Sequence, residues 1–131
     1  MKKNSPPFTI FKLEDDIALI KYTGVDMNLN SVIDLYDEIE KVGHGKKIAI
    51  LNVFPNYMRY DEEALKYSAS ARPPKILFAS AIVIESISIQ LIMMMFMRFN
   101  KQLVTRQVFN SKPRALIWLR EMRGAHFAGL L

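Results

Sequence analysis

A chain of 131 residues, of which 50% are hydrophobic and 24% charged, has the composition of a globular protein and excludes a disordered chain. We expect a single domain over residues 1–131. The absence of cysteine excludes disulfide bonds and thiolate chemistry and suits a cytoplasmic location. The net charge of +5 comes from scattered basic residues, so we expect no nucleic-acid partner. No apolar segment follows the first lysines, so we expect no signal peptide.

The first part of the chain predicts a hairpin and a helix. Apolar residues alternate on both sides of an acidic turn, which predicts a β-hairpin over residues 8–22. Apolar residues then recur at steps of three and four, which predicts an amphipathic helix over residues 28–43. Asn28 or Asn30 can cap the start of this helix, and the glycines of a Gly-His-Gly segment should end it.

The next segment predicts a buried strand followed by a helix. The centre of residues 46–54 is nearly all apolar, as in a strand that helices cover on both faces. Asp61 can cap a helix that follows it, over residues 62–71. Pro73 and Pro74 should stop that helix, because proline lacks the amide hydrogen that a helix interior needs.

The rest of the chain continues the alternation of strands and helices. It predicts a strand over 75–86, a methionine-rich helix that Ser86 or Ser88 opens and that reaches Phe99, a strand over 102–110 and a helix over 111–123. Ser111 can cap the last helix and Gly124 should end it, leaving a tail to pack on the body or on a partner. Such alternation favours a mostly parallel sheet.

This order of elements resembles the STAS domain, which has the SpoIIAA-like fold of anti-anti-sigma factors, and within it small bacterial STAS/SEC14-like proteins. The segments that carry the resemblance are "RYDEEALKYSAS", "ASAIVIESISIQLIMMMFMRFNK" and "VFNSKPRALIWLREM". The resemblance implies an α/β fold with an N-terminal β-hairpin, βα units, a mixed, mostly parallel sheet of four to five strands and four helices. It also implies a non-enzymatic regulatory or protein-interaction module. The alternative is a SEC14-like carrier of an apolar or lipid-like small molecule.

In typical anti-anti-sigma factors, phosphorylation of a serine at a helix start, after the third strand, switches partner binding. Residues 52–61 of this chain contain no serine or threonine, and Asp61 stands at the cap position. A fixed carboxylate there interacts with the helix N-terminus much as a phosphate would. We therefore expect no phosphoserine switch.

The loop before that helix is the first candidate site. It follows the carboxyl end of a buried strand and precedes a helix N-terminus, where ligands of α/β proteins commonly bind. Its tyrosines offer aromatic faces, and its arginine can bind an anion with two hydrogen bonds. We predict a ligand or partner site at Asn56, Tyr57, Arg59, Tyr60 and Asp61.

The methionine-rich helix is the second candidate site. Polar residues, including Glu85, interrupt the apolar run from Ile76 to Met97, so we do not expect it to span a membrane. On a helical wheel almost no polar face remains, and the outer side needs a cover. The tail, a second subunit or an apolar ligand can supply that cover, since methionine suits adaptable surfaces. The predicted interaction residues are Leu91, Met94, Met95, Phe96 and Arg98.

Signals for catalysis, metal or cofactor binding are weak. His44 and His126 are the only histidines, and neither has a second ligand at helical or hairpin spacing. Glu62 and Glu63 are adjacent, so they point to different sides of their helix and do not form a carboxylate pair. There is no glycine-rich phosphate loop. We expect no enzyme activity, no metal and no cofactor.

Overall fold

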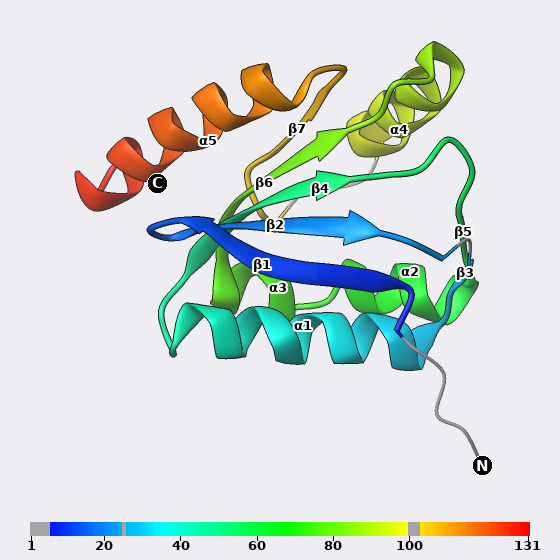
Figure 1. Ribbon diagram of the computed structural model, residues 1–131, viewed down its shortest axis with the longest axis horizontal. Coiled ribbons are helices and arrows are strands. Elements are labelled where there is room, and N and C mark those ends of the chain that lie inside the picture. Colours follow the sequence, from blue (N-terminus) through cyan, green and yellow to red (C-terminus); the bar gives the residue numbers. More distant parts are fainter. Residues whose placement is uncertain (1–5, 25, 100–102) are drawn as a thin grey trace.

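The computed structural model describes residues 6–24, 26–99 and 103–131, apart from the side chains of Phe96 and Phe99. Five strands form the central sheet: β1 (Phe8–Glu14), β2 (Ile17–Tyr22), β4 (Ile48–Val53), β6 (Leu77–Val83) and β7 (Arg106–Phe109). They lie in the order β1-β2-β4-β6-β7 (Figure 1). β1 is antiparallel to β2, and the other neighbouring strands are parallel. The expected hairpin and the mixed, mostly parallel sheet are confirmed.

Three helices cover one face of the sheet: α1 (Leu29–Gly43), α2 (Glu62–Ser68) and α3 (Arg72–Ile76) (Figure 1). The stripe on α1 packs against alternate residues of β1, β2 and β4, as the period of two in a strand requires. The centre of this core includes Ile20, Val32, Leu35, Ile39 and Ile50. The guanidinium group of Arg72 contacts Asp37 and Glu40, which fastens α3 to α1.

On the other face, α5 (Lys112–Phe127) packs across β4 and β6. Its fully buried Ala115 and Leu119 contact the second core, which the opposite side chains of these strands form. Arg120 and Arg123 pair with Glu14 on the hairpin, and the hydrogen bonds from Arg120 are the main cause of the lowered pKa of Glu14. α4 (Ile87–Phe99) lies near β7, at the opposite side of Figure 1 from the C-terminus.

Side chains at the helix starts explain where the helices begin. The carboxamide oxygen of Asn28 accepts the amide of Ser31 at 2.9 Å, so Asn28 and not Asn30 caps α1. The carboxylate of Asp61 accepts the amide of Ala64 at 2.9 Å, which confirms Asp61 as the cap of α2. The predicted cap of α5 by Ser111 is also confirmed.

The α1 terminus and the proline segment differ from the prediction. Gly43 is still helical, and the left-handed cap residue is His44, at φ 51°. α2 ends at Ser68, before the prolines. Pro73 and Pro74 then open the short α3, because the first turn of a helix does not need their missing amide hydrogens. This added helix brings the described part of the chain to five, where four were expected.

The prediction that Gly124 ends the last helix is wrong. α5 continues through Gly124 to Phe127, since a single glycine costs a helix only about 1 kcal/mol. The last turn is held on the sheet by His126, whose ring stacks on Phe78 with 4.3 Å between ring centroids.

Two short strands were not predicted from the sequence. β3 (Asp26–Met27) and β5 (Arg59–Tyr60) pair in parallel as a separate two-stranded sheet. Met27 is fully buried, so this small sheet fastens the segment before α1 to the candidate loop. Two-residue strands carry no periodicity, which is why the pattern of apolar residues did not predict them.

Candidate functional site

The outer side of α4 carries an exposed apolar surface, here called the α4 stripe. Its five side chains are each between 53% and 73% exposed: Ile87, Leu91, Ile92, Met94 and Met95. Leu91, Met94 and Met95 belong to the predicted interaction residues, and the predicted Arg98 is exposed on the same side. The side chain of the fifth, Phe96, lies outside the described residues. The solvent side of α4 is therefore mostly apolar, where a surface helix normally carries polar residues.

The inner side of α4 is only half-buried. Ile89, Met93 and Met97 point toward the body of the protein and retain partial exposure. The start of the helix is fixed by Ser86, whose hydroxyl accepts the amide of Ile89, and by Gln90, whose side chain donates to the carbonyl of Ile84. α4 is thus anchored at its N-terminal end and is not a central core helix.

The tail does not cover the α4 stripe. Residues 124–127 belong to α5, and the chain ends on the opposite side of the molecule from α4 (Figure 1). Leu130 and Leu131 are themselves exposed. The interpretation of the tail as a lid over a buried methionine helix is therefore wrong, because α5 runs away from α4 along the other half of the sheet.

The candidate loop is held in place by the side chains that were expected to bind a ligand. Arg59 pairs with Asp26 across the small sheet at 2.8 Å, and this ion pair raises the pKa of Arg59. Asp61 caps α2, and Tyr60 turns inward. Asn56 and Tyr57 remain exposed. The ligand site stays a prediction, with these two residues as its accessible part.

Tyr60 joins a buried polar group that no sequence pattern indicated, here called the tyrosine cluster (Tyr22, Tyr36 and Tyr60). Burial is the main cause of the raised pKa of each phenol. The Tyr22 hydroxyl donates to the side-chain oxygen of Asn52 at 2.8 Å. Asn52 in turn donates to the Ser80 hydroxyl and the Ala81 carbonyl, both at 3.0 Å.

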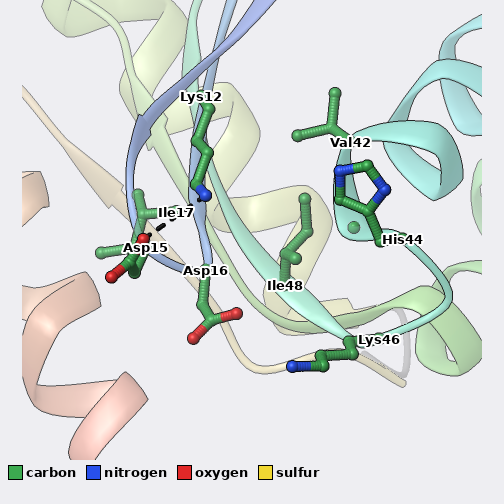
Figure 2. A pocket seen from close by; sticks show the side chains of 9 residues that line it. Lys12, Asp15, Asp16, Ile17, Val42, His44, Lys46 and Ile48 are labelled. Atoms are coloured by element: carbon green, nitrogen blue, oxygen red, sulfur yellow. Dashed lines mark ion pairs between the residues drawn. The ribbon is translucent and has the colours of Figure 1, made fainter.

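A hollow of about 300 Å³ lies at the other end of the sheet, between the β1–β2 turn and the loop after α1 (Figure 2). It is lined by Lys12, Asp15, Asp16, Ile17, Val42, Gly43, His44, Lys46 and Ile48. Lys12 and Asp15 form an ion pair of 3.4 Å between two exposed side chains. Two segments that are far apart in the sequence, residues 12–17 and 42–48, form this hollow, so spacing along the sequence gave no signal for it.

The described residues contain no group of three or more histidine, aspartate or glutamate side chains placed to hold a metal ion. In the same part of the chain, no helix has the length and apolar character needed to cross a membrane.

An antiparallel hairpin, parallel strands beyond it and helices on both faces define an α/β protein with a SpoIIAA-like fold. A similar solved structure is the crystal structure of an uncharacterized protein of the DUF3478 family with a SpoIIAA-like fold from Shewanella loihica PV-4. The TM-score is 0.62 at 17% identity, with 91% of this chain and 98% of that chain covered. The chain belongs to the family described as domain of unknown function DUF7793, whose model matches residues 11–123. No curated protein matches it.

Proposed function

We propose that this protein is a non-enzymatic, STAS-like regulatory module of the cytoplasm that binds a protein partner through the α4 stripe. The observation that carries the proposal is the exposure of five large apolar side chains on one helix. Contiguous apolar patches on soluble proteins commonly mark interaction sites, because water-exposed apolar area is costly. The lack of cysteine supports the cytoplasmic location.

The proposal includes no phosphoserine switch. Asp61 already satisfies the start of α2 with a permanent carboxylate, and no serine or threonine lies within residues 52–61. A partner would therefore be recognised without modification at this helix. The alternative function is binding of an apolar or lipid-like small molecule on the same stripe, and the experiment below separates the two.

The test replaces two stripe residues by a charged pair that keeps the helix. Leu91→Glu with Met95→Lys places opposite charges four residues apart, an arrangement that supports a helix. Because both side chains are exposed, the melting temperature should stay within about 3 °C of the wild type. Native mass spectrometry of protein purified from its own host without detergent should show an assembly for the wild type and a monomer for the variant.

The matched control is Ile117→Glu with Glu121→Lys, which makes the same charged pair on an exposed part of α5. This control should keep the assembly. An unfolded stripe variant, or a wild type that is a bare monomer, would overturn the proposal. A wild-type monomer that carries a lipid-sized adduct would favour the small-molecule alternative.

A further inference from the structure

We infer that the partner of the α4 stripe is a second copy of this chain, packed antiparallel through α4 about a two-fold axis. The inference rests on the proposed function, since it names the occupant of the same surface. It starts from two exposed charges at the ends of the helix, Glu85 just before α4 and Arg98 in its last turn. Among the described residues, neither of these two side chains has a partner in a hydrogen bond or ion pair.

The two charges flank the apolar surface, one before the start of α4 and one in its last turn. With a rise of about 1.5 Å per residue, Arg98 lies about 16 Å along the axis from Ile87, the first residue of α4, and Glu85 stands two residues before that start. The point midway between them falls between Leu91 and Ile92, and the α4 stripe is centred on Leu91 as well. A surface with this arrangement is complementary to itself.

A two-fold axis near Leu91 would use this symmetry. It lays Glu85 of each copy beside Arg98 of the other, with the apolar side chains of both copies between the two ion pairs. A parallel arrangement would instead bring Glu85 toward Glu85 and Arg98 toward Arg98, which like-charge repulsion disfavours. The antiparallel arrangement also opposes the two helix dipoles favourably.

The available area suits a modest dimer. Five apolar side chains that are each more than half exposed present on the order of 500 Å² per copy, so two copies bury about 1,000 Å². That area is near the lower limit for a specific interface, and the two ion pairs would then matter for stability and for orientation. A two-fold contact closes on itself and leaves no stripe free for further growth.

The experiment exchanges the two charges and measures sedimentation over a range of concentrations. Glu85→Arg places two positive charges together at each end of the interface, and Arg98→Glu places two negative charges there. We expect each variant alone to dimerise at least about ten-fold more weakly than the wild type. An equimolar mixture of the two variants should form a heterodimer, because every Arg then meets a Glu. The double variant should likewise recover the wild-type dimer.

Matched controls make the same changes of charge on α5, at the exposed Glu121 and Arg114. Glu121→Arg and Arg114→Glu should leave the dimer unchanged. A monomeric wild type, single variants that dimerise like the wild type, or a mixture that forms no heterodimer would each overturn the inference. The stripe variant could disrupt an assembly that contains another protein, or an assembly that Glu85→Arg and Arg98→Glu leave unchanged. In either case the proposed function stands and this inference fails.

Discussion

Replacing Asn52 by alanine should destabilise the fold more than any substitution on the α4 stripe. Asn52 is 4% exposed and makes three side-chain hydrogen bonds, to Tyr22, Ser80 and the carbonyl of Ala81. No described buried side-chain nitrogen or oxygen lacks a partner. The substitution leaves the hydroxyls of Tyr22 and Ser80 without their Asn52 partner inside the core, where water cannot replace it.

The magnitude follows from the groups left behind. A net contribution of about 1 kcal/mol per hydrogen bond, with the Tyr22 hydroxyl and the Ser80 hydroxyl losing a buried partner, gives a loss of about 3 kcal/mol. For a chain of this size, that loss should lower the urea midpoint by about 1.5 M. It should also lower the melting temperature by about 10 °C.

Urea unfolding followed by circular dichroism measures the effect, and a double-mutant cycle with Tyr22→Phe tests its origin. Tyr22→Phe alone should cost about 1 kcal/mol, and the double variant should cost less than the sum, because the two residues share a hydrogen bond. Asn56→Ala is the matched control, since Asn56 is exposed at the next loop. A loss of less than about 1 kcal/mol for Asn52→Ala, or strict additivity, would refute the reasoning.

Three further predictions concern pH, α5 and the loop. Burial raises the pKa of Tyr22 and Tyr60, so the stability these phenols contribute is complete below pH 10 and is lost as the pH rises above it. The urea midpoint should therefore fall between pH 10 and pH 11, and an unchanged midpoint between pH 9 and 11 would contradict this. Gly124→Ala should stabilise the protein by about 0.5–1 kcal/mol in thermal unfolding, because α5 has open space there and alanine is the better helix former. Arg59→Ala should leave the melting temperature nearly unchanged, since its ion pair with Asp26 is exposed to solvent. If the loop is a site, Arg59→Ala should still change partner binding, and a large loss of stability would show a structural role instead.

The elements that sequence analysis predicted well are those that bury one regular face. The stripe of α1 repeats every three to four residues, and its buried Val32, Tyr36 and Ile39 are the members that the period indicates. The strands at 48–53 and 77–83 are buried on both faces and read as nearly continuous apolar runs. Such patterns are local, so a single sequence is enough to read them.

The features that it missed depend on contacts between distant segments. Tyr22 and Asn52 are 30 residues apart, and each stands in a strand where a polar residue looks like an outward position. Pro73 and Pro74 are equally consistent with the end of one helix and the start of the next, and only the turn before them decides. The ion pair of Arg59 with Asp26 could not be foreseen, because the strands that carry them have two residues each.

The sequence did show that α4 has no polar face, but it could not show which side faces water. That depends on where the sheet lies, and the structure places Ile89, Met93 and Met97 inward and the α4 stripe outward. The outward side chains contribute little to the core of the monomer. Asn52 and its hydrogen-bond partners are buried, so a protein partner could not contact them. Stability and assembly should therefore respond to different substitutions. Asn52→Ala should lower the melting temperature and leave the dimer intact at low temperature. The stripe variant should be a monomer with a nearly unchanged melting temperature. If both changes lowered both quantities together, dimerisation and folding would be one coupled process, as in obligate dimers.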